Sequence, residues 1–460
     1  MLFINGYEWG PAVSKLIVEL DREVKGVQVD ETRVLTAGTP REVEQAFVSD
    51  AKGESVSQAS HFVTLDLSVS YDLEQHADVA SPFSYDAARA HYKWVDTYEV
   101  TVADLSLVLV DGSKATESAT LDAVDQRIIP EADLFSVRST FNGEYENPLT
   151  HKMTSLSLNY AGYEPPYVSE SEISPLIVWL HGQGEGGTDI EVALLGNEVT
   201  ALTRPEIQSQ FRTGSRTGAH VLVVQTPTYW MDEGDGANGP GAGKSLFTEI
   251  LMDTIQQYVD QNDRIDGYRI YLGGASNGGY MTLNMILNYP DTFAAAFPVC
   301  PAYSFYGFSR MKDGNYRTTT DKYGRRRYVS SSERCLSDEV LKRIVNVPLW
   351  FIHAATDHVV VPFLTTEPTY RRLLRLGAEN AWFSYFETVR GLDIIDEKYS
   401  GHASWMYLFN NEVSGVQIAE AVKATGEYKP SDKLKGGKAK ATDGVVDYKT
   451  IFEWMNNQRR

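Results

Sequence analysis

Cysteine, basic residues and long apolar runs are all scarce in this chain of 460 residues. Its two cysteines, Cys300 and Cys335, are too few for a disulfide framework or a cysteine-based zinc site. They are compatible with one disulfide between them or with two free thiols. No run of 18 or more apolar residues occurs, so no membrane-spanning helix is expected. Ordinary apolar and charged fractions indicate a globular protein with a core of its own.

Basic charge is outnumbered throughout, most strongly near the start of the chain. The sequence has 62 acidic and 42 basic residues, a net charge of −20. Residues 1–133 contain 24 acids and 10 bases (−14), and the remainder contains 38 and 32 (−6). An acidic surface without a basic stripe repels phosphate backbones and anionic lipid heads. We therefore expect no nucleic acid and no membrane as partners, whereas a homo-oligomer is compatible with the sequence.

Signal-peptide features and metal-binding spacings are also missing. The first residues have neither a basic nor an apolar region, so either the protein stays inside the cell or a signal was removed; we favour secretion. No His-Glu-x-x-His or comparable spacing occurs, so we expect a mechanism without metal or cofactor. Residues 239–245 resemble a P-loop, but Asn238 stands where its first glycine belongs and no buried strand runs into it.

Two domains are expected from the length and from a change in pattern near residue 133. Residues 1–133 alternate apolar and other side chains at period two, between turn-rich stretches, which predicts an immunoglobulin-like β-sandwich. No repeat of 40–50 residues is present, so a propeller is not expected. Residues 134–460 alternate apolar strands with helical patterns, which predicts an α/β domain with a doubly wound, mainly parallel sheet.

Two excursions interrupt this alternation. Residues 303–338 contain an aromatic cluster and then two strand-like runs around the turn at 321–324, which predicts a β-hairpin. Residues 412–447 include the Lys/Gly-rich run 433–440, which predicts a mobile surface loop. The last residues, from Tyr448 to Arg460, are expected to form a closing helix.

The most informative stretch is Gly-Ala-Ser-Asn-Gly at residues 274–278. It lies between a strand-like run at 268–272 and a helix-like run that ends at Pro290. A serine on such a sharp strand-to-helix turn, flanked by glycines, is typical of a nucleophile elbow. The pattern and its placement therefore predict Ser276 as a nucleophile.

A serine hydroxyl needs a base and an orienting carboxylate, in the chain order Ser, Asp or Glu, His in this type of sheet. Asp357 follows the apolar strand 349–352, and His402 lies in a turn of small residues before a helix, so we assign them as orienter and base. Four other residues are less suitable candidates. His353 is expected to be a packed strand histidine, His358 adjoins Asp357, and Asp393 and Asp396 follow no clear strand.

The tetrahedral intermediate needs N–H donors for its oxyanion. Asn277, directly after the nucleophile, supplies one donor by geometry. The second is assigned to the N–H of Gln183, with Gly184 as the alternative, because the glycine-rich loop 181–187 follows the strand 176–180. A simple turn remains the other interpretation of that loop.

Together these residues resemble the α/β-hydrolase superfamily. The closest likeness is to bacterial esterases of the polyhydroxybutyrate-depolymerase and feruloyl-esterase type with an N-terminal immunoglobulin-like domain. The resemblance rests on the loop 181–187, the pentapeptide 274–278, Asp357 before Val-Val-Val-Pro and residues 401–405, with a looser likeness at residues 8–20. It implies a triad of Ser276, Asp357 and His402, an ester substrate, and a front domain that assists rather than catalyses.

The sequence favours a serine carboxylesterase acting through an acyl-enzyme on Ser276. Its substrate is expected to be a small-molecule or polymer-linked carboxylic ester. Trp230, Tyr280 and Trp405 are candidates for lining the substrate pocket, with core packing as the alternative for each. The other hypotheses are a prolyl-oligopeptidase-like serine peptidase and a binding protein with an inactive hydrolase domain.

Overall fold

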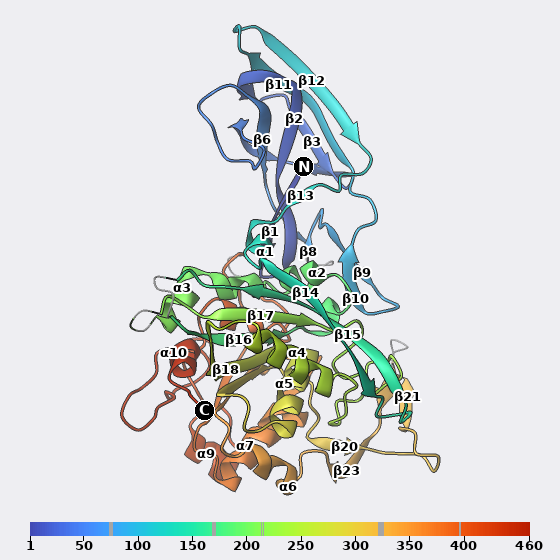
Figure 1. Cartoon of the computed structure of the whole chain (residues 1–460), viewed down its shortest axis with the longest axis vertical. Helices are drawn as coiled ribbons and strands as arrows, with labels where there is room; N and C mark the ends of the chain where they lie inside the picture. The colour runs from blue at the N-terminus through green and yellow to red at the C-terminus, as the bar shows by residue number, and fades with distance from the viewer. Residues whose placement is uncertain (73–76, 168–171, 213, 215, 321–325, 395–396) are drawn as a thin grey trace. The chain divides into compact units, whose positions relative to one another are not determined.

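The computed structural model describes residues 1–460 except 73–76, 168–171, 213, 215, 321–325 and 395–396. The chain divides into two compact units, drawn in Figure 1. The first comprises Met1–Leu134 and Leu194–Thr200, and the second comprises Phe135–Ala193 and Ala201–Arg460. The border predicted from the sequence lies between residues 133 and 134.

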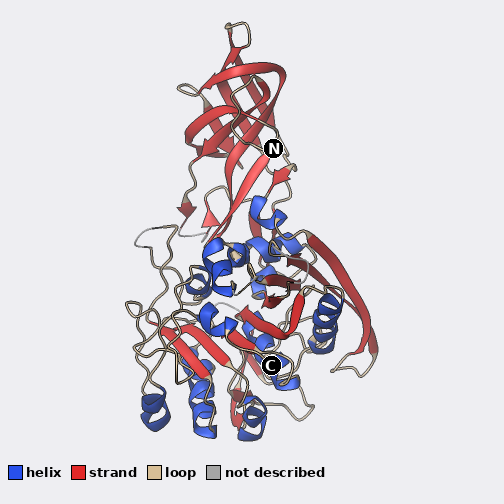
Figure 2. Ribbon diagram, turned by 60° about the vertical axis from the view of Figure 1, so that its left-hand side comes forward, coloured by secondary structure: helices blue, strands red, loops and turns tan. Residues whose placement is uncertain are grey.

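The first unit is built from strands, as Figure 2 shows. Buried and partly exposed residues alternate along its first strand, because successive side chains of a strand point to opposite faces. The main sheet follows the path β13-β1-β2-β11-β3-β4, with β12 beside β11, β6 beside β2, and β5 beside β6. The all-β prediction for this region is confirmed. The strands are β1 (Leu2–Tyr7), β2 (Gly10–Gln28), β3 (Arg33–Thr36), β4 (Thr39–Arg41), β5 (Val43–Ser49), β6 (Ser60–Leu67), β7 (Tyr71–Asp72), β8 (Ala77–Asp78), β9 (Phe83–Asp86), β10 (His91–Trp94), β11 (Val100–Leu109), β12 (Lys114–Leu121) and β13 (Arg127–Ile128), followed by α1 (Pro130–Asp133).

The second unit is organised around one eight-stranded sheet in the order β14-β15-β17-β16-β18-β19-β24-β25. Its first two strands are antiparallel to their neighbours, and the other six run parallel. The predicted doubly wound, mainly parallel sheet is therefore confirmed. The strands are β14 (Val137–Glu146), β15 (Met153–Tyr163), β16 (Ser174–Leu180), β17 (His220–Gln225), β18 (Ile265–Ala275), β19 (Ala295–Val299), β24 (Leu349–Ala354) and β25 (Ala381–Phe386).

Both faces of this sheet are covered, because its central strands are apolar on both sides. Leu272 belongs to the core shared with α4 and α5, whereas the neighbouring Tyr271 stacks on Phe211, which in turn meets Phe452 of α10. The helices are α2 (Ile190–Leu195), α3 (Pro205–Gln208), α4 (Thr248–Asp260), α5 (Asn277–Asn288), α6 (Asp338–Leu341), α7 (Thr366–Leu376), α8 (Trp405–Phe409), α9 (Ala419–Thr425) and α10 (Ile451–Asn456), with 3-10 turns η1 (Gln183–Glu185), η2 (Val199–Thr203), η3 (Ser209–Phe211), η4 (Lys342–Ile344) and η5 (Pro362–Leu364). None of the described helices is long and apolar enough to cross a membrane.

The first excursion contains the predicted hairpin. β21 (Thr318–Thr320) pairs antiparallel with β22 (Arg326–Tyr328), and the turn predicted between them falls among residues that the structure does not describe. A second small pair, β20 (Tyr306–Phe308) with β23 (Ser330–Arg334), flanks it.

The mobile surface loop predicted for residues 433–440 is wrong at its centre. Gly436 and Gly437 are buried, and Gly436 accepts a hydrogen bond from the Tyr385 N–H of β25 at 2.7 Å. A Cβ at Gly437 would lie 2.1 Å from the Val416 carbonyl oxygen. The glycines therefore provide close packing against the sheet, where the sequence suggested flexibility. The closing helix is confirmed as α10, over part of its predicted length.

Candidate active site

Five consecutive strands of the second sheet each lead into one candidate residue. Gln183 follows β16, Ser276 follows β18, Cys300 follows β19, Asp357 follows β24, and His402 lies in the connection after β25. Because these strands are parallel, their carboxyl ends meet at one edge of the sheet, which is where open α/β sheets bind ligands. Four of the five residues are those selected from the sequence.

Ser276 occupies the turn between β18 and α5. Its backbone has φ 56° and ψ −109°. A positive φ of this kind is strained for any residue with a side chain. The Ser276 N–H donates to the Val299 carbonyl at 2.9 Å, and the Ser276 carbonyl accepts from Tyr280 N–H at 2.9 Å and Ala302 N–H at 3.0 Å. The turn is thus held on both sides, which is the geometry of a nucleophile elbow.

Because residues 274 and 278 are glycines, the end of β16 packs directly against this elbow. A Cβ on Gly278 would lie 2.0 Å from the Leu180 carbonyl oxygen and 2.6 Å from that of His181. A Cβ on Gly274 would lie 2.5 Å from the same Leu180 oxygen. The glycines of the pentapeptide therefore bring the loop 181–187 directly against the residues around Ser276.

The two predicted oxyanion residues are linked through their side chains. Gln183 begins η1, and Asn277 begins α5. Asn238 Nδ2 donates to Gln183 Oε1 at 2.7 Å, and Asn277 Nδ2 donates to Asn238 Oδ1 at 2.9 Å. The Met231 N–H donates to Asn277 Oδ1 at 3.3 Å. A chain of amides thereby fixes both residues whose N–H groups were selected, and Asn238 is its central member.

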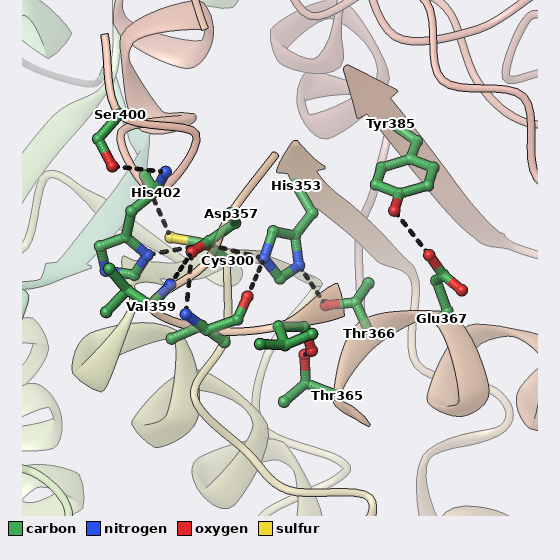
Figure 3. Close-up of polar contacts among 12 residues, drawn as sticks. Cys300, His353, Asp357, Val359, Thr365, Thr366, Glu367, Tyr385, Ser400 and His402 are labelled. Atoms are coloured by element: carbon green, nitrogen blue, oxygen red, sulfur yellow. Dashed lines mark hydrogen bonds and ion pairs between the residues drawn. The ribbon is translucent and has the colours of Figure 1, made fainter. Parts of the chain in front are cut away.

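Asp357 is completely buried and accepts four hydrogen bonds. Its Oδ1 accepts from the N–H groups of Val359 and Val360 at 2.8 and 2.9 Å. Its Oδ2 accepts from His402 Nδ1 at 2.8 Å and from His353 Nε2 at 3.0 Å, so Figure 3 shows the carboxylate between two imidazoles. Burial raises the pKa of this carboxyl group, but the two histidines outweigh burial and hold the pKa below its ordinary value. The group is therefore ionised at neutral pH.

His402 reaches Asp357 because of a glycine. A Cβ at Gly401 would lie 2.4 Å from the Thr356 carbonyl carbon and 2.5 Å from the Asp357 nitrogen, so the two loops touch at this point. Since Nδ1 donates to the carboxylate, Nε2 is the basic nitrogen of the neutral ring. Burial lowers the pKa of His402, but the neighbouring Cys300 and Asp357 raise it by more, and the net pKa lies above its ordinary value.

Cys300 lies beside this pair as a buried free thiol, and Cys335 is also free, so the two cysteines form no disulfide. Cys300 adopts φ 35° and donates to the His402 carbonyl at 3.3 Å. The ligand atoms of Cys300, Asp357 and His402 lie within 4.8 Å of one another, a spacing that a metal ion can use. Two of them, Asp357 and His402, are already hydrogen-bonded to each other at 2.8 Å.

The competing residues occupy less suitable positions. His358 is exposed on the loop after Asp357, and Asp393 is exposed in the connection that follows β25. Asp396 lies outside the described residues. His353 is packed, as expected for a strand histidine, yet its ring contacts the Asp357 carboxylate directly.

The three aromatic candidates differ in exposure. Trp230 is fully buried against His181 and Phe247, and Tyr280 is fully buried with its hydroxyl donating to the Lys244 carbonyl at 2.7 Å. Packing, the alternative considered for both, accounts for them. Trp405 keeps some exposed surface, and its ring meets that of His402 edge-on at 5.6 Å.

The first excursion contacts the loop 231–238, which is hydrogen-bonded to Asn277 through Met231 and Asn238. The Tyr328 hydroxyl donates to the Asn238 carbonyl at 3.1 Å, and the Tyr316 hydroxyl donates to Glu233 at 3.0 Å. Burial raises the pKa of Glu233, and the hydrogen bond from Tyr316 opposes this. The hairpin region therefore packs on the loop 231–238, next to the amide chain.

Sequence patterns had no means of selecting His353, Asn238 or Gly401. A histidine in an apolar strand is usually packed, and the direction of its ring depends on the loop that follows. In the sequence, Asn238 stands out only because it occupies the position of the first glycine of a P-loop. A single glycine before a histidine gives no sign of the backbone it touches.

Comparison with known families and structures gives a consistent result. Residues 1–114 match the esterase Ig-like N-terminal domain, and residues 243–388 match the prolyl oligopeptidase family. A structure described as a thermostable esterase is 20% identical, with a TM-score of 0.63, over 89% of this chain and 95% of its own. At this identity the likeness shows the fold.

Other similar proteins match smaller parts of this chain. A poly(3-hydroxyalkanoate) depolymerase C from Paucimonas lemoignei is 38% identical over 70 residues, which span 15% of this chain and 16% of that protein. Est1E from Butyrivibrio proteoclasticus is 17% identical over 58% of this chain and 92% of its own, with a TM-score of 0.34. The chain thus combines an esterase-type immunoglobulin-like domain with a domain of the α/β-hydrolase fold.

Proposed function

We propose that this protein is a serine carboxylesterase in which Ser276 is the nucleophile, His402 the base and Asp357 the residue that orients the base. The observation that carries the proposal is the 2.8 Å hydrogen bond from His402 Nδ1 to a buried Asp357, at the same sheet edge as a serine with φ 56°. A positioned base and a serine on an elbow turn are the two requirements for attack by serine on an acyl group.

In the first half-reaction, Ser276 Oγ attacks the ester carbonyl carbon while its proton passes to His402 Nε2. The carbonyl electrons move to the oxygen, and the N–H groups of Asn277 and Gln183 donate to this oxyanion. The bond to the alkoxy oxygen then breaks, and His402 returns the proton to the departing alcohol. An acyl-enzyme on Ser276 remains.

In the second half-reaction, His402 takes a proton from water, and the resulting hydroxide attacks the acyl carbon. The bond to Ser276 breaks, the serine recovers its proton from His402, and the carboxylic acid leaves. Throughout, the ionised Asp357 stabilises the imidazolium and keeps Nδ1 as the donating nitrogen.

An ester substrate is favoured by the type of domain that precedes the catalytic domain. The first unit is an esterase-type immunoglobulin-like domain, and the thermostable esterase is similar over nearly the whole chain. The propeller weighed for the peptidase alternative would consist of several four-stranded blades, whereas the described residues of 1–134 form one nine-stranded sheet and two two-stranded pairs.

A peptidase is the second candidate, because residues 243–388 match the prolyl oligopeptidase family. Both reactions use the same three residues, so substrate assays separate them. We expect hydrolysis of p-nitrophenyl esters and no cleavage of a prolyl p-nitroanilide peptide. Peptide cleavage that exceeds ester hydrolysis would replace the esterase by the peptidase.

The central test is labelling with a fluorophosphonate probe. The wild-type protein should be labelled, Ser276→Ala should lose both label and ester hydrolysis, and Ser57→Ala, at an exposed serine of the first unit, should keep both. A wild type without labelling or hydrolysis would refute the proposal. Esters of increasing acyl length, methyl ferulate and a poly(3-hydroxyalkanoate) film, compared by kcat/KM, would then define the acyl group.

A further inference from the structure

A second histidine contacts the carboxylate of the proposed triad from the side opposite His402. His353 lies near the end of β24, and its side chain is completely buried. Its Nε2 lies 3.0 Å from Asp357 Oδ2 and 2.9 Å from the Val360 carbonyl oxygen, and its Nδ1 lies 2.8 Å from Thr366 Oγ1. Figure 3 shows the ring between Asp357 and Thr366. None of the catalytic steps above uses it.

These contacts fix where the proton of His353 resides. A carboxylate oxygen and a carbonyl oxygen only accept, so Nε2 must carry the hydrogen. Nδ1 of the neutral ring is then an acceptor, and the Thr366 hydroxyl, which can donate, satisfies it. A neutral His353 thus has a partner for each ring nitrogen.

The same contacts close the loop that carries Asp357. Val360 donates its N–H to Asp357 Oδ1 and accepts from His353 at its carbonyl. His353 therefore holds both the carboxylate and the backbone that positions it. Thr366, the first residue of α7, holds the ring from the other side.

We propose that His353 is a positioning residue of the triad, whose Nε2–H fixes Asp357 Oδ2 and shares that oxygen with His402 Nδ1. The inference rests on the proposed function, since it assigns His353 a role through Asp357. Every hydrogen bond to a carboxylate stabilises its charge, and the charge stabilised by one donor is less available to another. His353 therefore lowers the basicity that Asp357 confers on His402.

Other ionisable groups surround the pair and stay constant in the test. Cys300, after β19, contacts the His402 carbonyl. Tyr385 of β25 lies opposite His353 in the strand register, and its hydroxyl donates to Glu367 of α7 at 2.6 Å. Neither group makes the Nε2 contact that the variants remove.

A matched pair of variants isolates the Nε2–H donor. In His353→Gln the amide nitrogen can take the place of Nε2, whereas His353→Met has similar reach and no donor. Glutamine also offers an acceptor oxygen to the Thr366 hydroxyl, whereas methionine offers only a weakly accepting sulfur, so this contact needs a control of its own. Thr366→Val provides the reverse control, because it removes the hydroxyl and keeps the donor.

The first measurement is independent of activity. Histidine resonances labelled with ¹³C are followed against pH by NMR, and His402 is assigned by its absence in His402→Gln. We expect the pKa of His402 to rise by about one unit in His353→Met and to stay near the wild-type value in His353→Gln and Thr366→Val. An unchanged His402 pKa in His353→Met would overturn the inference.

The second measurement is the pH dependence of kcat/KM for p-nitrophenyl acetate. The acid limb should move to higher pH in His353→Met only, with a loss at neutral pH of about 10- to 100-fold. A loss of rate without displacement of the limb, matching a loss of folded protein, would reduce His353 to a core residue. If the wild type does not hydrolyse esters, the proposed function fails, and the NMR titration still decides the contact.

A third measurement needs no substitution. The ¹⁵N shifts of the wild-type rings distinguish the nitrogen that carries hydrogen. His353 should show a protonated Nε2 and an unprotonated Nδ1 below and above the titration of His402. The opposite tautomer would exclude donation to Asp357 and overturn the inference, whatever the stability of the variants.

Discussion

Each unit of this molecule contains a carboxylate whose side chain has no exposed surface, and the two behave in opposite ways. Asp78 in the first unit and Asp357 in the second both have side chains with no exposed surface. Burial raises the pKa of Asp78 above its ordinary value, although the positive charge of Arg41 acts to lower it. Burial also acts to raise the pKa of Asp357, but hydrogen bonds from two histidines hold that pKa below its ordinary value. Burial is common to both groups, so the difference lies in their partners.

Arg41, the partner of Asp78, mainly holds parts of the first unit together. Arg41 lies 3.6 Å from Asp78, farther than a hydrogen bond, and its guanidinium donates to the carbonyls of Val13 and Ser68 and to the Thr36 hydroxyl. These groups belong to different strands or their ends, so Arg41 ties the sheet together. The carboxylate of Asp78 accepts backbone N–H groups from Ser70 at 3.0 Å and Ala80 at 3.2 Å. The carboxylate of Asp357 accepts from two imidazoles in addition to two backbone N–H groups. One buried charge stabilises architecture, and the other orients the base in the proposed mechanism.

The largest effect is expected where the orienting carboxylate loses its charge. Asp357→Asn should lower kcat/KM for p-nitrophenyl acetate by about 10⁴-fold, because an amide no longer stabilises the His402 imidazolium. Asp78→Asn, matched in chemistry and burial, should leave kcat/KM per folded molecule unchanged. Equal losses in the two variants would remove the distinction between the carboxylates.

The next effect concerns stability. Arg41→Met should lower the free energy of unfolding of the first unit by about 3–5 kcal/mol, because Asp78 is left buried without its cation. The folded pKa of Asp78 is raised, so its contribution to stability is present at low pH and is lost as pH rises. The destabilisation by Arg41→Met should therefore be larger at pH 7 than at pH 4.5.

Urea unfolding of the full chain at both pH values, followed by near-UV circular dichroism, measures this. Rates of ester hydrolysis by the folded variant should match the wild type. A destabilisation that is equal at both pH values would show that Arg41 acts through its carbonyl contacts alone.

The uncharged Asn238 tests whether a residue that positions its neighbours without a charge has a comparable influence on the rate of hydrolysis. Asn238→Ala removes the amide that bridges Gln183 and Asn277, so both oxyanion donors lose an anchor. We expect kcat to fall by about 10- to 100-fold with little change in KM, since the donors act mainly on the transition state. Asn315→Ala, at an exposed site of the excursion, is the control. A rise in KM at constant kcat would place Asn238 in substrate binding instead.

The sequence predicted what short patterns determine. The elbow could be found because strand, glycine, serine and helix are contiguous, and the order of Asp357 and His402 follows from the topology of the sheet. The two-domain organisation followed from a change of hydrophobic period from two to the helical pattern. The hairpin of the first excursion was likewise a local signal.

What the sequence did not predict depends on contacts between distant segments. Gly436 and Gly437 looked like a flexible tract, yet they are buried against β25, because glycine serves close packing as well as flexibility. Gly401 has the same role between the loops of His402 and Asp357. His353 and Asn238 acquire their roles from the loops that fold over them, and no local spacing encodes such partners.

A third carboxylate, Glu233, lies between the two extremes and gives the smallest expected effect. It is 9% exposed, burial raises its pKa, and its closest donor is the Tyr316 hydroxyl at 3.0 Å. Tyr316→Phe removes that donor, so the pKa of Glu233 should rise further while Asp357 and His402 keep theirs. We expect a change in kcat/KM of less than about fivefold, increasing above neutral pH, where an ionised Glu233 without its donor disfavours the packed hairpin. The measurement is the ratio of variant to wild-type kcat/KM from pH 5 to 9. A flat ratio would show that the hairpin is held by the rings of Phe308 and Tyr328 rather than by this carboxylate.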